Sequence, residues 1–372
     1  MKNAAFMKKT PIVFLLMLSI IFTAVLGLNA VNAEGAGFFS SSDQFTSRDL
    51  EQTPDLKAAV YLSVADNTDM YITKAGVYVI SGNASNATVY VEAASNDKVQ
   101  LVLEGVSIIN SNYPCIYVIK ADKVFVTAIG DNTLMVTGAF RSEGSTNGVV
   151  FSKSDLVLNG TGSLTISSTD NCIVCKDDLK ITGGTYNITA ASKTIEANDS
   201  IRIAGGSFTL KAGTDGLHAE NGDDSSLGYI YITGGTFAII AADDAIHGQS
   251  VIQIDDGEFF ISAAEGMEGT YVQINGGTIS IQGRDDGINA GRKSNAYRAT
   301  IEINGGSVTI VMSSGDTDGI DSNGDLYING GIINVTGGST FDYDGTAQYN
   351  GGTIIVNGQQ VDYIPNQMRG IR

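Results

Sequence analysis

Acidic side chains recur at regular intervals through the second half of the sequence. Each occurrence is followed by a small residue, an aliphatic residue and a polar residue. Aligning these units places five carboxylates in one register: Asp215, Asp244, Glu265, Asp286 and Asp318. A second register, three positions further on, holds His218, His247, Glu268, Asn289 and Asp321. Asp243 and Asp285 add a second carboxylate to two of the units.

Several carboxylates in register form a candidate metal site. If the units stack as neighbouring strands, successive carboxylates lie about 4.8 Å apart. They would repel by roughly 1 kcal/mol in water, or about 3 to 4 kcal/mol in a groove. Calcium, which takes several oxygen ligands, would relieve this repulsion outside the cell, whereas a solvated Asp-Gly corner is the alternative. We expect calcium ligands among Asp215, Asp243, Asp244, Glu265, Glu268, Asp285, Asp286, Asp318 and Asp321.

Charge and aromatic content restrict the partners. The net charge of −18 argues against a nucleic-acid partner, and the lack of tryptophan argues against a tryptophan platform for sugars. We expect Tyr231 and Tyr327 to be exposed and to stack on sugar rings instead. The basic residues near the acidic registers could clamp a substrate carboxylate; they are Arg284, Arg292, Lys293 and Arg298. Both histidines are interpreted as exposed members of their register, since no Ser-His-Asp arrangement can be argued.

The elements that must position these residues repeat around pairs of glycines. The pairs, such as Gly205-Gly206 and Gly276-Gly277, recur every 20 to 30 residues, a period typical of solenoids. Aliphatic residues alternate with polar ones on both sides of each pair, which predicts two strands joined at a glycine corner. We therefore predict an all-β fold, a right-handed parallel β-helix of roughly a dozen coils.

Asparagines and cysteines are given structural interpretations. Four consecutive units carry an asparagine just before the corner, and stacked amides can hydrogen-bond along such a row: Asn275, Asn304, Asn329 and Asn350. The chain has three cysteines, too few for a disulfide framework. Cys115 and Cys172 fall in one register two coils apart, beyond disulfide reach, and Cys172 and Cys175 lack two further zinc ligands. We expect all three to be small core residues.

The two ends of the sequence differ from the repeats. Residues 1–33 combine lysines, an apolar run and a Val-Asn-Ala site, which predicts a secretory signal peptide, with an uncleaved signal anchor as the alternative. Residues 34–57 are polar and are expected to form a loosely packed lead-in or linker. The β-helix is expected over residues 58–365, followed by a tail at 366–372. The mature chain is therefore expected outside the cell, secreted or on the surface, without a membrane span.

An ordered series of motifs then gives a family resemblance. It comprises ITKAGVYVISG from Ile72, VQLVLEGVSIINS from Val99, GDNTL from Gly130, LVLNGTGSLTI from Leu156, and the later ITGGT and DGI units. Over residues 66–361 the chain resembles the clostridial-type β-helix carbohydrate-binding proteins. That resemblance implies a secreted, calcium-containing protein that binds acidic pectic polysaccharide and cellulose.

That family is in turn similar to the family 9 pectate lyases, whose calcium lies on a D-D-G-hydrophobic-D cluster. The run from Asp285 to Asn289 matches this pattern except that Asn289 replaces the last aspartate. The run from Asp318 to Asp321 lacks the first aspartate of the pattern. In the unit that begins with Asp243 and Asp244, His247 occupies the position of the last aspartate. The individual ligands therefore stay open.

The predicted function is non-catalytic, calcium-dependent binding of polysaccharide outside the cell, with polygalacturonate, and also cellulose, as the implied polymers. A calcium-dependent lyase is the first alternative, but it needs a base beside the metal, and no family lyase motif surrounds the basic cluster. A structural surface adhesin is the second alternative. The sequence does not indicate an oligomeric state.

Overall fold

A computed structural model describes residues 37–141, 146–315 and 317–366. In these residues the chain is all-β: apart from the short helix α1 (Ser41–Gln44), its regular structure is 34 strands of one mostly parallel sheet. The predicted signal peptide at 1–33 lies outside the described residues. Within the described residues, no helix is long and apolar enough to cross a membrane.

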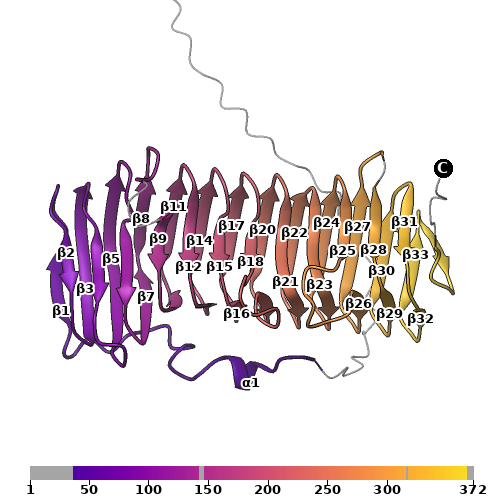
Figure 1. Ribbon diagram of the computed structural model, residues 1–372, viewed down its shortest axis with the longest axis horizontal. Helices are drawn as coiled ribbons and strands as arrows, with labels where there is room; N and C mark the ends of the chain where they lie inside the picture. The colour runs from indigo at the N-terminus through magenta and orange to yellow at the C-terminus, as the bar shows by residue number, and fades with distance from the viewer. Residues whose placement is uncertain (1–36, 142–145, 316, 367–372) are drawn as a thin grey trace, which may run out of the picture. The chain divides into compact units, whose positions relative to one another are not determined.

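The strands form three stacks, here called ladders 1, 2 and 3, which the chain visits in turn (Figure 1). Ladder 1 contains β1 (Val60–Ser63), β3 (Gly76–Ser85), β5 (Lys98–Asn110), β7 (Lys123–Ile129), β10 (Asp155–Gly160), β13 (Asp178–Ile181), β16 (Ser200–Ile203), β19 (Tyr229–Ile232), β21 (Asp244–Ile254), β23 (Glu265–Ile274), β26 (Thr300–Ile303), β29 (Asp325–Ile328) and β32 (Ala347–Tyr349). Ladder 2 contains β8 (Asp131–Val136), β11 (Ser163–Ser168), β14 (Thr185–Ala190), β17 (Ser207–Ala212), β20 (Thr236–Ala241), β22 (Glu258–Ala263), β24 (Thr278–Gly283), β27 (Ser307–Met312), β30 (Ile332–Thr336), β33 (Thr353–Val356) and β34 (Gln359–Val361). Ladder 3 contains β2 (Met70–Ile72), β4 (Val89–Glu92), β6 (Ile116–Lys120), β9 (Gly148–Ser152), β12 (Asn171–Cys175), β15 (Ile195–Ala197), β18 (Leu217–Ala219), β25 (Asp286–Ala290), β28 (Asp318–Ser322) and β31 (Ser339–Tyr343).

Four long strands span two ladders. β3 and β5 end in ladder 2, and β21 and β23 begin in ladder 3. From β6 to β18 each strand pairs in parallel with the third strand after it, as β13 does with β16. At the C-terminal end β34 pairs antiparallel with β33.

The alternating aliphatic residues form the core, as the sequence predicts. On ladder 1 Ile201 pairs with Ile230, and both are fully buried. On ladder 2 the rings of Phe208, Phe237 and Phe259 stack with centroids 4.6 Å apart. Stacking places equivalent apolar side chains on top of one another, so each strand removes its inner face from water. At the corner, Gly206 has φ +125°, a conformation that side-chain-bearing residues rarely adopt.

The asparagine and cysteine predictions are also confirmed. The amides of Asn304, Asn329 and Asn350 each donate to the preceding asparagine of the row at 2.7–2.8 Å. All three cysteines are buried and unbridged. Cys115 and Cys172 both align with Val149, because their strands pair successively with β9.

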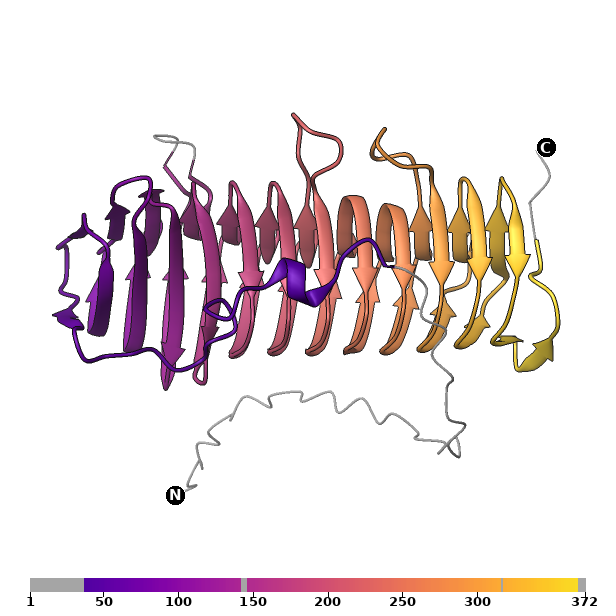
Figure 2. The same cartoon turned by 90° about the horizontal axis from the view of Figure 1, so that it is seen from below.

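The segment before the first strand is not loosely packed, contrary to the prediction. Phe39 stacks on Tyr229, 4.4 Å between ring centroids. Asp49 is 1% exposed and its carboxylate lies 2.9 Å from the Lys180 ammonium. The segment follows the outer face of ladder 1 (Figure 2), where its aromatic and acidic side chains find matching partners. Hydrophobic contact and a shielded ion pair hold it there.

Candidate functional site

One outward position of ladder 3 forms a continuous row of side chains, here called the outer row. Successive strand pairings place its members in register. In order, the outer row contains Tyr71, Tyr90, Tyr117, Phe151, Val174, Glu196, His218, His247, Glu268, Asn289, Asp321 and Asp342. It is aromatic at the N-terminal end and acidic at the C-terminal end.

The predicted acidic register lies at the start of the same ladder and is here called the corner row. Asp244 pairs with Glu265, and Asp286 pairs with Asp318, as the spacing predicts. The backbone N–H of Asp244 donates to the Asp215 carboxylate at 3.3 Å. The additional carboxylates Asp243 and Asp285 are exposed. The two rows together bring the predicted carboxylates onto one face.

The middle of this face is electrostatically balanced. Nδ1 of His218 lies 2.9 Å from Asp215 Oδ2, and Nδ1 of His247 lies 2.9 Å from Asp244 Oδ2 and 2.8 Å from Glu268 Oε2. Lys293 forms an ion pair with the other Glu268 oxygen. Burial alone would lower the pKa of His247, but its bonds to Asp244 and Glu268 outweigh burial and raise it to about 9.

The prediction that this register faces solvent is wrong for two members. His218 is 7% exposed and Glu268 is 6% exposed. Both point away from the core, but loops close over them: Glu220 contacts His218 and Lys293 contacts Glu268. The loops themselves are joined, since the Ser294 hydroxyl donates to the Ser225 carbonyl. Figure 2 shows both loops rising beyond the strands.

The C-terminal part of the face is not balanced. In the described part of the chain no basic side chain forms an ion pair with Asp286, Asp318, Asp321 or Asp342. Burial, followed by the charges of neighbouring aspartates, raises the pKa of Asp286 to about 6 and that of Asp321 to about 7. Between the two parts, burial and the charges of Glu268 and Asp244 raise the pKa of Glu265 to about 8.

The donor set of this unbalanced part fits a hard cation. Asn289 Oδ1 and Asp342 Oδ1 are buried and have no hydrogen-bond donor among the described residues. They stand on either side of Asp321 in the outer row. Buried oxygen acceptors without donors, beside repelling carboxylates, are what a calcium ion would satisfy. Asn289, which departs from the lyase pattern, thus still presents a buried oxygen without a donor among the described residues.

The predicted basic cluster is divided among several partners. Arg284 donates to the carbonyls of Ala241 and Ala242 at 3.2 and 2.9 Å. Lys293 is held by Glu268, and Arg298 lies 2.9 Å from Asp325. Arg292 is exposed and donates only to Asn295 among the described residues.

Arg292 also lines the cluster's open side. With Tyr297, Arg298 and Asn323 it borders a hollow beside the acidic face. Arg292 is therefore the member of the cluster best placed to meet a ligand carboxylate.

The two predicted sugar-stacking tyrosines are not equivalent. Tyr231 is fully buried, so the prediction that it is exposed is wrong. Its hydroxyl donates to Asp255 at 2.7 Å, and Phe45 from the N-terminal segment lies over its ring. Alternation places Tyr231 outside the core, but a distant segment covers it. Tyr327 is half-buried on ladder 1.

The aromatic end of the outer row was not predicted from the sequence. Tyr71 is 64% exposed and stacks on Tyr90, 4.9 Å between centroids at 5°. Tyr90 and Tyr113 line a hollow that also includes Asn112 and Arg141. The signal was present in the sequence: extending the polar register of the later units back into the irregular first units leads to these tyrosines.

Together, the fold and the face define a class: an all-β repeat protein with one long outer surface, aromatic at one end and acidic at the other. A family model described as "Carbohydrate-binding domain-containing protein" matches residues 66–314 and 262–363, and the chain belongs to this family.

A relative from Acetivibrio thermocellus with the same description is 33% identical over 136 residues, which are 35% of this chain and 47% of the relative. The match therefore spans about half of that relative's length. A solved structure titled as a polysaccharide lyase-like protein from C. thermocellum, gadolinium derivative, is 19% identical with a TM-score of 0.33. The comparison covers 80% of this chain and 96% of that one.

Proposed function

We propose that the protein is a secreted, non-catalytic, calcium-dependent polysaccharide-binding protein whose ligand is an acidic, pectin-like polygalacturonate. We infer further that the three ladders form a right-handed parallel β-helix of about a dozen coils, since successive strands return to the same ladder. The family membership supports polysaccharide as the partner. The acidic end of the outer row supports calcium as the link to that partner.

One observation carries the calcium proposal. Asp286, Asp318, Asp321 and Asp342 lack basic partners in the described chain, and buried acceptor oxygens of Asn289 and Asp342 lie beside them. An acidic polymer cannot approach such a surface without a cation between the two. Calcium held by these residues would supply that charge and would also take carboxylate oxygens from the polymer. Arg292 would clamp a further uronate carboxylate.

The aromatic end of the outer row suits uncharged sugar chains such as cellulose. Tyr71 and Tyr90 offer aromatic surface, and amide and guanidinium groups of Asn112 and Arg141 stand nearby. Aromatic rings contact the apolar faces of sugars, while the polar side chains bond their hydroxyls. We therefore propose that Tyr71 and Tyr90, rather than Tyr231, stack on sugar rings.

The basic residues argue for binding over lyase chemistry. A lyase base must be neutral to accept the proton beside the uronate carboxylate. Burial would lower the pKa of Lys293, but its bond to Glu268 dominates and raises it, which keeps the ammonium charged. Arg298 is likewise held by Asp325. Neither group is prepared to act as a base.

Retention on immobilised polygalacturonate tests the proposal. We expect retention in calcium, loss in chelator, and weaker retention when Arg292 and Lys293 are both changed to alanine. Lys211→Ala, at an exposed position of ladder 2, is the matched control and should leave retention unchanged. Soluble polygalacturonate should show no rise in the ultraviolet absorbance of unsaturated uronates. Such a rise, abolished by Lys293→Ala, would instead establish a lyase, and no retention under any condition would favour an adhesin.

A further inference from the structure

We infer that His218, His247 and Glu220 form a binding site for a borderline divalent transition-metal ion, with zinc as the reference ion, separate from the acidic end of the outer row. The inference goes beyond polysaccharide binding and does not depend on it. It uses the two histidines of the chain, which the calcium proposal leaves without a role.

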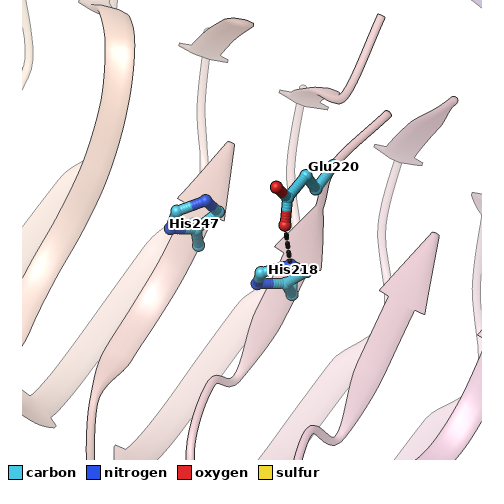
Figure 3. Close-up of side chains that lie close together, drawn as sticks. All are labelled: His218, Glu220 and His247. Carbon is cyan, nitrogen blue, oxygen red and sulfur yellow. Dashed lines mark hydrogen bonds and ion pairs between the residues drawn. The ribbon is translucent and has the colours of Figure 1, made fainter. Parts of the chain in front are cut away.

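The three side chains bring their donor atoms close together. His218 lies on β18 and His247 lies at the paired position of β21. Their rings are stacked, 4.6 Å between centroids and 13° apart. Glu220, at the start of the loop after β18, places Oε2 3.2 Å from His218 Nε2. One donor atom from each residue lies within 4.8 Å of the other two (Figure 3).

A carboxylate lies behind each histidine ring. Each histidine Nδ1 faces an aspartate three residues earlier, Asp215 or Asp244, at 2.9 Å. At His247 this contact is a hydrogen bond, which keeps a proton on Nδ1, so a metal would bind at Nε2 and displace the second proton of the imidazolium. At His218 the two atoms are equally close, but Nδ1 makes no hydrogen bond among the described residues. Zinc-bound histidines characteristically have a carboxylate in this position. The arrangement occurs twice on adjacent strands, because the Asp-x-x-His unit itself is repeated.

The donor types select the metal. Calcium and magnesium take oxygen ligands, whereas imidazole nitrogen suits zinc, copper and nickel. Two histidines and one glutamate are a known ligand set for zinc that keeps a fourth position open. Donors bonded to tetrahedral zinc at about 2.0–2.1 Å are roughly 3.4 Å apart. The His218–Glu220 pair already meets this separation. The two stacked rings, with centroids 4.6 Å apart, would have to tilt toward each other around the ion, and the Glu220 side chain, 57% exposed, has room to follow.

A bound ion would join two neighbouring strands and the loop that begins at Glu220. Since the ion would bind only the folded arrangement, it would also stabilise the protein by mass action. This gives the site two measurable consequences, metal uptake and a rise in melting temperature. Neither requires a polysaccharide.

Titration of the chelator-treated full chain with zinc, in excess calcium, tests the inference. We expect one zinc ion per chain, and a visible absorption spectrum of tetrahedral cobalt when cobalt replaces zinc. Glu220→Gln, at an exposed side chain that the fold does not need, should weaken zinc binding about 10-fold or more, and Asp215→Asn should weaken it about 10- to 100-fold through His218. Glu258→Gln, exposed on ladder 2, is the matched control and should change nothing.

Three outcomes would contradict the proposed zinc site. No zinc uptake, or displacement of zinc by calcium, would overturn the inference. So would uptake that persists in both Glu220→Gln and His247→Gln. Loss of calcium-dependent retention on polygalacturonate leaves this titration unaffected, so the two proposals fail separately.

Discussion

Asp321 provides the sharpest test of how the acidic end of the outer row works. Burial, and then the charges of Asp286, Asp318 and Asp342, raise its pKa from 3.8 to about 7. A rise in pKa of this size corresponds to about 4 kcal/mol. Because the side chain is only half-buried, solvent screening reduces this cost to about 1–2 kcal/mol. In metal-free protein above neutral pH, the ionised Asp321 should therefore destabilise the fold.

Asp321→Asn should raise stability without calcium and reduce the additional stability that calcium gives. Asparagine fits this position, because Asn289 occupies the same register on the preceding strand of ladder 3. In chelator at about pH 8 the variant should be more stable by about 1–2 kcal/mol, or roughly 2 to 4 °C in melting temperature. In calcium it should gain less than the wild type, because an oxygen ligand and its charge are lost.

The pH dependence follows from the sign of the shift. A carboxyl group whose pKa is raised by folding stabilises the fold below its unfolded pKa of 3.8, and this contribution is lost as pH rises through about 7. Wild-type protein in chelator should therefore lose stability over this interval, and Asp321→Asn should lose less. Thermal denaturation across the interval, with and without calcium, measures both effects.

Asp362→Asn is the matched control, because it removes the same charge at an exposed position outside both rows. It should leave the calcium-induced shift intact. The reasoning would be refuted if Asp321→Asn melted below the wild type in chelator above neutral pH. A calcium-induced shift equal to that of the wild type would equally exclude Asp321 as a ligand.

Three further changes test the core, the N-terminal segment and the aromatic end. Ile274→Asp should destabilise by about 4 kcal/mol or more, since an unpaired charge would enter the core; exposed Ile240→Asp is its control in thermal melts, and equal melting temperatures would contradict the register. Asp49→Asn should cost about 3 kcal/mol by leaving the Lys180 ammonium unpaired, and limited proteolysis should then cut within residues 37–57. Tyr71→Ala should weaken retention on cellulose but leave calcium-dependent retention on polygalacturonate unchanged; loss of both would argue against two separable ends.

The core could be predicted from the sequence because its signal is local. Alternation with a period of 2 identifies inward residues such as Ile252 and Ile274, and the glycine corners align one unit with the next. The same alignment correctly predicted the pairing of Asp286 with Asp318. Parallel stacking carries each position unchanged to the next strand, so spacing along the chain becomes position along the ladder.

Coverage of the outer faces could not be predicted in this way. Phe39 bonds through its backbone to Gln253, 214 residues away, and Phe45 covers Tyr231. No repeat links residues 37–57 to ladder 1, so alternation reports only that Tyr231 is not in the core. The polar composition of the segment also concealed its few aromatic anchors, which suffice to order it.

The balance of charge along the acidic face depends on loops rather than on register. In register alone, His247 and Asn289 are equivalent neighbours of Glu268. Lys293 reaches Glu268 from outside the ladder, and Glu220 reaches His218 in the same way. The loops thereby compensate the carboxylate charge in the middle of the face and leave the carboxylate charge around Asp321 uncompensated. Two registers of polar residues in the sequence thus become two chemically different regions: one offers histidine nitrogens, for which we propose a transition metal, and the other offers carboxylate and amide oxygens, for which we propose calcium.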